Sequence, residues 1–337
     1  MSANYTLIIL FIAACLDYLI GDPWSWPHPV KIVGWIITHY TKQIFKLTKP
    51  HQDNSRVFIL RLAGILLAIA LVFGSGIITW LIIQALRINF VQFPLLTVIT
   101  ESILLASCFA GKSLSMAAQE VLQLVRSNNL IQARQKLSMY VGRDTENLSK
   151  SEIFRAIFET VTENATDGVI APLFYALVGA IIPGVGSVPL AFAYKAASTL
   201  DSMVGYKEAP YTDIGWFSAK LEDVLTWLPC RLNVLTVALL SGKPLYVWRI
   251  CQRDAVKDPS PNAGWSECVY AASLGVQIGG TNFYQGVVKH KPLLGDPIYP
   301  ITPEIIDQAL QLTRYCFLIW LGLFFICYIM SGSMGIV

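Results

Sequence analysis

The stretch "LAGILLAIALVFGSGIITWLII" at residues 62–83 contains no charged side chain. About 17–25 apolar residues suffice for a helix to cross the hydrocarbon core of a bilayer, so this stretch is long enough to span a membrane. Four further apolar stretches lie at residues 5–20, 93–110, 169–194 and 315–331. The whole chain is 54% hydrophobic and 14% charged, whereas a soluble domain has about 25% charged residues. The sequence therefore predicts an all-α, polytopic integral membrane protein.

The polar residues gather in connectors between the apolar stretches. The connectors at residues 22–57, 111–168 and 241–314 are rich in Lys and Arg, which favours the cytoplasmic side of a membrane. The connector at 195–222 shares that side only if a neighbouring apolar segment does not cross. We expect one membrane-embedded helical domain over residues 1–337, in a multi-pass protein of the cell membrane. Its helical connectors would carry the functional site on the cytoplasmic side.

Two apolar segments are predicted to dip into the membrane and return. Residues 181–192, "IIPGVGSVPLAF", are interrupted by prolines and glycines, and such broken backbone is tolerated in a membrane where protein shields it. Residues 224–240 contain Pro229 and, near the middle, Arg231, whose insertion costs about 2.5–3.5 kcal/mol. The sequence therefore predicts about four to six membrane segments, some of them re-entrant.

The cysteines and histidines give no sign of a metal centre. The seven cysteines form no C-x-x-C pair, and the four histidines show no ligand spacing. Structural zinc needs clustered Cys and His ligands, so we expect neither zinc nor a disulfide framework. The net charge of +3 says little about partners, and we expect no nucleic acid among them.

Three carboxylates at a spacing of four stand before an apolar run in "FETVTENATDGVIAPLFYALV", residues 158–178. Glu159, Glu163 and Asp167 would lie near one side of a helix, where like charges repel by about 0.2–0.5 kcal/mol per pair. One interpretation is a solvated helix face on which Arg155 pairs with Glu159. The other is a Mg²⁺ site formed by the three carboxylates, because Mg²⁺ takes one or two carboxylates together with substrate phosphates.

The segment before this stripe contains a helix start. In "SKSE" (149–152), Ser149 and Glu152 match a capping box. This pattern predicts a helix from about 150 to 166 that stops at Gly168. Residues 112–139 are predicted to form two amphipathic helices, and we expect helical structure throughout the chain.

Other polar segments supply the remaining candidates for a site. "VGRDTENL" (141–148), "YKAASTLDSMVGY" (194–206), "DAVKDPSPNAGWSE" (254–267) and "GGTNFYQG" (279–286) combine charged and amide side chains with glycines. For Lys195 a lysine that extends to the membrane interface is an equal alternative. The candidate catalytic residues are Glu163, Asp167, Lys195 and Asp201, and the candidate substrate- or nucleotide-binding residues are Arg143, Asp144, Asn164, Thr199, Lys257, Asn262 and Asn282.

These stretches together resemble the cobalamin-biosynthesis membrane family called CobD/CbiB, the adenosylcobinamide-phosphate (cobinamide) synthases. The matching strings are "LDYLIGDPWSWPHPVKIVG", "VGRDTENL", "ETVTENATDGVIAPLFYAL", "AYKAASTLDSMVGY", "DPSPNAGWSE" and "GGTNFYQGVV". They occur in this order from residue 16 to residue 288. The resemblance therefore covers most of the chain.

The resemblance implies a ligase. Its expected reaction is the ATP-dependent formation of an amide between the propionate f carboxylate of adenosylcobyric acid and (R)-1-aminopropan-2-ol or its O-phosphate. ATP and Mg²⁺ are the expected cofactors, and the lipid bilayer and other corrinoid-pathway enzymes are further expected partners. The motifs supply acids, a lysine and an arginine for phosphate chemistry.

Two other classes of protein remain as alternatives. A polytopic membrane transporter would also have broken helices and buried carboxylates, but it should show inverted internal repeats and ionisable residues at mid-membrane. A non-catalytic membrane scaffold of a corrinoid-modifying complex is the third interpretation. Amide formation by the purified protein alone would separate the enzyme from the scaffold.

Overall fold

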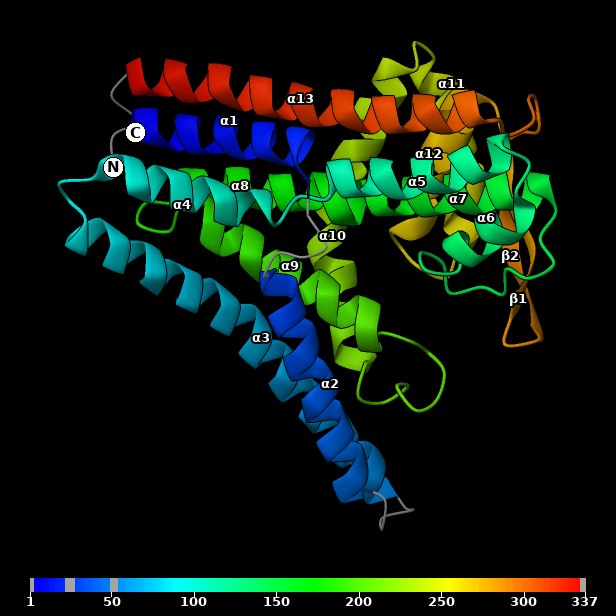
Figure 1. Ribbon diagram of the computed structural model, residues 1–337, viewed down its shortest axis with the longest axis horizontal. Helices are drawn as coiled ribbons and strands as arrows, with labels where there is room; N and C mark the ends of the chain where they lie inside the picture. Colours follow the sequence, from blue (N-terminus) through cyan, green and yellow to red (C-terminus); the bar gives the residue numbers. More distant parts are fainter. Residues whose placement is uncertain (1–2, 22–27, 49–53, 334–337) are drawn as a thin grey trace. The chain divides into compact units, whose positions relative to one another are not determined.

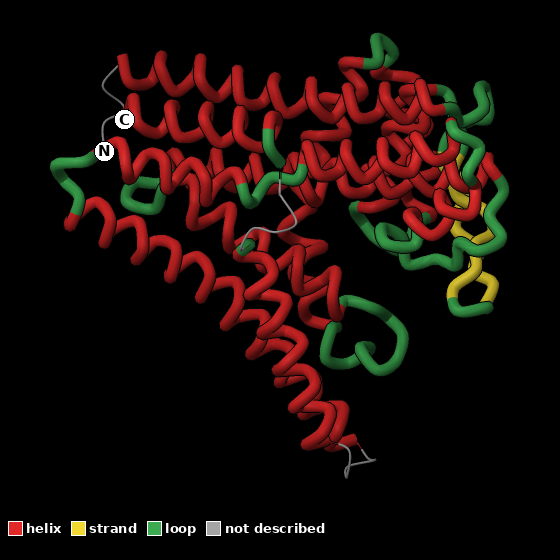
Figure 2. Tube along the Cα trace, viewed as in Figure 1, coloured by secondary structure: helices red, strands yellow, loops and turns green. Residues whose placement is uncertain are grey.

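The computed structural model describes residues 3–21, 28–48 and 54–333, and these are mostly helical (Figures 1 and 2). Parts of the first connector and of the string "LDYLIGDPWSWPHPVKIVG" lie outside the described residues. Four helices are long and apolar enough to cross a membrane, and a fifth span results if the bent pair of helices Pro94–Ala106 and Gly111–Arg126 is counted as one. The predicted class, an all-α polytopic membrane protein, is confirmed. The four helices are Ser55–Asn89, Lys150–Ile181, Trp216–Leu240 and Pro303–Ser331.

The chain forms two compact units. Unit 1 contains residues 1–110, 171–225 and 321–337, and unit 2 contains residues 111–170 and 226–320. Each boundary after residue 110 falls inside a continuous helical segment, so no Gly- or Pro-rich linker marks it in the sequence. The connectors 111–168 and 241–314 fall almost entirely in unit 2, which has the richer set of polar contacts.

Unit 1 consists of long helices joined by short turns. Its elements are α1 (Ala3–Leu19), α2 (Pro29–Thr48), α3 (Asn54–Asn89), α4 (Pro94–Ala106), α8 (Ala171–Ile181), α9 (Ser187–Val204), the first part of α10 (Trp216–Leu240) and the last part of α13 (Pro303–Ser333). Helix α9 packs against α2, α3, α4 and α8, and its Leu200 and Val204 are buried in a core with Ile37, Leu67 and Leu71.

The predicted break within residues 181–192 is confirmed as a tight turn between α8 and α9. Gly184 and Gly186 have φ values of +80° and +91°, a backbone conformation that residues with a Cβ rarely adopt. The Gly186 amide donates to the Gly179 carbonyl at 3.1 Å, and a Cβ on Gly179 would lie 2.3 Å from the Gly186 carbonyl oxygen. The glycines therefore let the two helices meet closely.

The predicted interruption of residues 224–240 is not observed. Pro229 lies inside α10, which is one continuous helix and one of the candidate spans. Arg231 is accommodated by protein: its guanidinium donates to the Pro261 carbonyl at 2.8 Å and stacks on the rings of Trp227 and Trp265. These contacts offset the cost of the charge that suggested a re-entrant segment.

Unit 2 packs helices around a small β-hairpin. Its helices are α5 (Gly111–Arg126), α6 (Leu130–Leu137), α7 (Lys150–Asn164), a π-helical segment η1 (Ala165–Ile170), the second part of α10, α11 (Pro244–Asp254), a 3-10 turn η2 (Ala255–Lys257), α12 (Ala263–Leu274) and the first part of α13. Helix α7 contacts α5, α6 and α12. The two helices predicted for residues 112–139 are confirmed as α5 and α6.

The hairpin was not predicted, because helical structure was expected throughout the chain. Strand β1 (Ile278–Tyr284) pairs antiparallel with β2 (Val287–Leu294). Its two-residue turn is formed by Gln285 and Gly286, with φ values of 51° and 77°, as the tight turns of twisted hairpins require. The alternating segment "TNFYQGVVKHK" around a glycine was the available signal.

Candidate functional site

Helix α7 carries the acidic stripe and begins as predicted. The Ser149 side chain accepts from the Glu152 amide, and the Glu152 carboxylate accepts from the Ser149 amide, so both halves of the capping box are formed. The predicted stop at Gly168 is wrong, because the chain continues from α7 through η1 into α8 without a break. A π-helical turn replaces the i→i+4 bonds by i→i+5 bonds and often marks a functional site.

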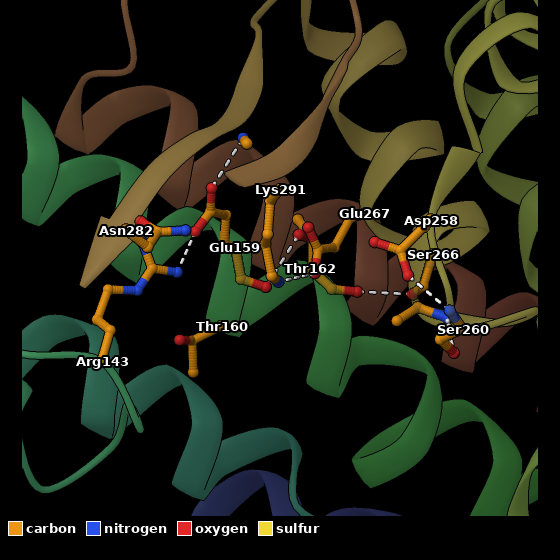
Figure 3. A network of polar contacts seen from close by, with 12 residues as sticks. Arg143, Glu159, Thr160, Thr162, Asp258, Ser260, Ser266, Glu267, Asn282 and Lys291 are labelled. Atoms are coloured by element: carbon orange, nitrogen blue, oxygen red, sulfur yellow. Dashed lines mark hydrogen bonds and ion pairs between the residues drawn. The ribbon is translucent and has the colours of Figure 1, made fainter. Parts of the chain in front are cut away.

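Glu159 is fully buried and both of its carboxylate oxygens are engaged (Figure 3). Oε2 accepts from the Arg143 guanidinium, and Oε1 accepts from the Gly279 amide at 2.9 Å. Arg143 also donates to Asn282 Oδ1 at 2.9 Å. The ion pair thus joins the 141–148 loop, α7 and β1 at one point.

Arg155 binds the hairpin from the same helix. Its guanidinium donates to the carbonyls of Gly279 and Thr281 and, at 3.1 Å, to Asn282 Oδ1. The expected pairing of Arg155 with Glu159 is therefore replaced by contacts with β1. The Nδ2 group of Asn282 is buried and has no hydrogen-bond partner among the described residues, so this amide can still donate to a ligand.

The three carboxylates of the stripe do not form the predicted three-ligand metal site. Among the residues that the structure describes, no group of three or more His, Cys, Asp or Glu side chains could hold a metal ion. Glu159 is bound to Arg143 and to the Gly279 amide instead, so both of its oxygens are occupied. Glu163 and Asp167 are partly exposed and remain candidate ligands as a pair.

A second ion pair, between a buried carboxylate and a partly exposed lysine, lies beside the first and was not predicted (Figure 3). Lys291 on β2 contacts Glu267 on α12, with 3.4 Å between Nζ and Oε1. Burial raises the pKa of Glu267, and the nearby carboxylates Glu163 and Glu159 raise it further, against the opposing effect of Lys291. Burial alone would lower the pKa of Lys291, but Glu267, Glu163 and Glu159 raise it above its usual value.

Hydroxyl groups connect α7 and η1 to α12 and α10. Ser266 donates to the Thr162 carbonyl at 2.6 Å and lies 2.6 Å from the Thr166 hydroxyl. Asn233 on α10 donates to Thr166 at 3.0 Å. These buried bonds fix α12, and therefore Glu267, against the acidic stripe.

The "DPSPNAG" loop leads into α12. Asp258 accepts from the Ser260 amide at 2.8 Å, and the Ser260 hydroxyl accepts from the amides of Asn262 and Ala263. A Cβ on Gly264 would lie 2.4 Å from the Asp258 Cβ. This glycine therefore allows the carboxylate of Asp258 to sit close to the start of α12.

The other predicted residues of unit 2 have mainly structural contacts. Asp144 accepts from the amides of Gln285 and Gly286, and Lys257 donates to Asp254 at 2.8 Å. Asn262 accepts from Arg231 at 3.4 Å. Asn164 is exposed and donates to the Thr160 carbonyl. Of the predicted binding residues, the structure brings Arg143 and Asn282 together with the stripe.

Three predicted residues belong to unit 1 and lie on α9. Thr199 donates to the Lys195 carbonyl at 2.7 Å within the helix. Asp201 lies near the end of the same helix, where Gly205 leaves space for its carboxylate: a Cβ there would lie 1.9 Å from Oδ1. The cluster around α7 consists of unit 2 residues alone, so the roles of Lys195, Thr199 and Asp201 stay predictions.

A family model described as CobD/Cbib protein matches residues 10–313. The chain belongs to the CobD/CbiB family. A "Cobalamin biosynthesis protein CobD" from Synechocystis sp. is 54% identical over 98% of this chain and 94% of its own length. A protein of the same name from Halalkalibacterium halodurans is 40% identical over 91% of each chain. "Cobalamin biosynthesis protein CbiB" from Salmonella typhi is 39% identical over 95% of this chain and 96% of its own.

Membership of the CobD/CbiB family supports a role in cobalamin biosynthesis and confirms the resemblance seen in the sequence. No solved structure matches the chain. Four of the strings that carried the resemblance supply unit 2 residues of the cluster: Arg143, the acidic stripe, Glu267 and Asn282. Glu267 was overlooked although it ends "DPSPNAGWSE", whereas nothing in the sequence around Lys291 distinguished it from other lysines.

Proposed function

We propose that this CobD/CbiB protein is a membrane-bound ligase that forms an amide with the use of ATP. It joins (R)-1-aminopropan-2-ol or its O-phosphate to the propionate f carboxylate of adenosylcobyric acid. The observation that carries the proposal is the buried cluster of unit 2, in which the cations Arg143 and Lys291 lie among the carboxylates Glu159, Glu163 and Glu267. Buried charges of both signs at this density are typical of sites that handle charged reactants.

The reaction explains why such groups are needed. A carboxylate is a poor acyl donor, since attack by an amine would have to expel oxide. Transfer of a phosphoryl group from ATP to the carboxylate gives an acyl phosphate and ADP. The amine then forms the C–N bond, the C–O bond to phosphate breaks, and the ammonium proton passes to a carboxylate. We assign the neutralisation of phosphate charge in this transfer to Lys195.

The residues present fit a Mg²⁺ ion held by two carboxylates. Glu163 and Asp167 would hold it, which is the number of carboxylates that Mg²⁺ commonly takes together with substrate phosphates. Bound there, Mg²⁺ would neutralise charge on the phosphoryl group in transfer. Glu159 is excluded from this set because Arg143 and Gly279 occupy its oxygens.

The direct test uses the purified protein in lipid nanodiscs. With ATP, Mg²⁺, adenosylcobyric acid and an amine donor, the protein alone should form the amide, detected by mass, with one ADP released per product. Formation of product only after addition of another corrinoid-pathway enzyme would favour the scaffold. Failure of both conditions would contradict the ligase.

Replacing Lys195 by Ala should reduce turnover at least about 10²-fold, equivalent to about 2.7 kcal/mol of transition-state stabilisation. The ammonium serves as a point charge for phosphate, so Lys195→Arg should recover only part of the loss. Lys220→Ala is the control, because Lys220 is an exposed lysine of the same unit. Normal turnover in both Lys195 variants would show that this lysine only anchors the helix at the interface.

The proposed cytoplasmic location of the site can be tested by cysteine labelling. Gln252 on α11 is exposed, as is Asn89 at the end of α3. In a Cys327→Ser background, a membrane-impermeant maleimide should label Gln252→Cys only after permeabilisation, while Asn89→Cys reacts in intact cells. Labelling of Gln252→Cys in intact cells would place the connector 241–314 outside.

A further inference from the structure

The Glu267–Lys291 pair is the least satisfied charged contact of the cluster. Only 1% of the Glu267 side chain is exposed, and Lys291 is the single ion-pair or hydrogen-bond partner that the described residues give it. A carboxylate can accept about four hydrogen bonds, and charge-assisted bonds are usually about 2.7–2.9 Å long. The one contact of Glu267 is 3.4 Å long, so the described residues leave most of its acceptor capacity unused although the side chain is almost entirely buried.

The neighbouring Arg143–Glu159 pair shows what a satisfied pair looks like in the same cluster. The two oxygens of Glu159 accept from a guanidinium and from a backbone amide. No backbone amide turns toward Glu267 among the described residues. A buried pair stabilises a fold only when further hydrogen bonds satisfy its remaining atoms. Structural stabilisation therefore accounts for Glu159 better than for Glu267.

The pair is accessible from one side. Lys291 is 29% exposed, against 1% for Glu267. A lysine ammonium sits on a flexible four-carbon chain, so it can leave one anion and bind another nearby. A ligand that approaches from the Lys291 side can therefore separate the two charges while each keeps a partner.

The electrostatic surroundings favour a second cation at Glu267. Glu163, Glu159 and Asp258 all act on Glu267 as negative charges. Arg143 neutralises Glu159 and Mg²⁺ would neutralise Glu163, which leaves Asp258 as additional negative charge around the pair. An incoming ammonium is attracted to this region, whereas an incoming anion is attracted only to Lys291.

We infer that the Glu267–Lys291 pair binds a small zwitterion by exchange of partners. The ammonium of the ligand replaces Lys291 at Glu267, and the anionic group of the ligand binds Lys291. The exchange gives Glu267 a new cation and Lys291 a new anion, so neither charge is left without a partner. This inference rests on the proposed function, in which the zwitterion is the amine donor in its phosphorylated form. Glu267 and Lys291 then determine which amine donor the protein selects.

The test compares aminopropanol O-phosphate with unphosphorylated aminopropanol. Lys291→Met keeps the length of the side chain and removes its charge. It should raise the KM for the phosphorylated donor at least about tenfold and leave the KM for the unphosphorylated donor and for ATP unchanged. Glu267→Gln should raise the KM for both donors, because both carry the ammonium. Lys289→Met is the matched control, since Lys289 is an exposed lysine on the same strand.

The double variant Glu267→Gln/Lys291→Met separates ligand binding from a structural role. If the pair only stabilised the fold, removal of both charges would restore the wild-type thermal midpoint and the wild-type KM together. The inference expects a restored midpoint with a KM for the phosphorylated donor that stays at least about tenfold high. A wild-type KM in Lys291→Met, or a raised KM for ATP alone, would overturn it.

Direct binding distinguishes failure of this inference from failure of the proposed function. Calorimetric titration of the phosphorylated donor into the nanodisc-embedded protein without ATP should give binding to wild type and none to Lys291→Met. Binding without any amide formation would contradict the ligase and keep the zwitterion site. Amide formation with an unchanged donor preference in Lys291→Met would support the ligase and contradict the zwitterion site.

Discussion

Glu163→Gln should reduce amide formation at least about 10³-fold, equivalent to about 4 kcal/mol of transition-state stabilisation. The change keeps the shape of the side chain and removes an anionic oxygen from the proposed pair of Mg²⁺ ligands. It also removes one of the negative charges that face Lys291. The rate should be measured at limiting Mg²⁺, with the membrane level of the protein checked in parallel.

Two further variants define what this loss means. Asp167→Asn should show a loss that extra Mg²⁺ partly reverses, because one carboxylate and the substrate phosphates still bind the ion. Glu146→Gln makes the same chemical change at an exposed position of unit 2 and should have no effect. Activity within threefold of wild type for both Glu163→Gln and Asp167→Asn would show that no catalytic Mg²⁺ is bound by these residues of α7 and η1.

Arg143→Met should destabilise the protein by about 3–5 kcal/mol, because it leaves the buried carboxylate of Glu159 without a counter-charge. The measurement is the free energy of unfolding in mixed micelles, with the thermal midpoint as a second readout. Addition of Glu159→Gln should restore most of the loss, since a neutral amide oxygen can still accept from the Gly279 amide.

Arg155→Met is the matched control for the effect of charge. Arg155 donates to three acceptors in the cluster and Arg143 to two, but the acceptors of Arg155 are two carbonyls and an amide oxygen, all of them neutral. Its removal should cost about 0.5–1.5 kcal/mol for each lost bond and strand no carboxylate. Glu159→Gln should therefore not rescue Arg155→Met, and equal rescue of both arginine variants would show that the pair of Arg143 with Glu159 is not special.

The helices could be predicted from the sequence because their signals are local. The capping box at Ser149 and the apolar stretch at 62–83 depend on neighbours within a few residues. The continuation of the helix from α7 past Gly168 could not be predicted in this way. It depends on packing against α12 and α10 through Ser266 and Asn233, which supports the π-helical turn. The interruption predicted from Pro229 and Arg231 was wrong for a similar reason, because contacts from distant loops accommodate Arg231.

The site was predicted to the extent that its residues stand in unusual strings. Arg143, Glu159 and Asn282 were selected from the sequence, and the structure brings them together. Their roles were not predictable, since the partner of Glu159 is Arg143 rather than a metal ion, and that choice depends on a loop and a strand far apart in the chain. Lys291 required the hairpin, whose strands bring it beside Glu267.

The adjacent residues Arg143 and Asp144 bind two different elements of the fold. Arg143 reaches the carboxylate of α7, while the carboxylate of Asp144 holds the amides at the hairpin turn, at 2.9 Å and 2.8 Å. An insertion or deletion between these two residues would shift one connection relative to the other by a residue's length. The length of this loop is therefore fixed by the need to make both connections at once, whereas its outer side chains are free of that constraint.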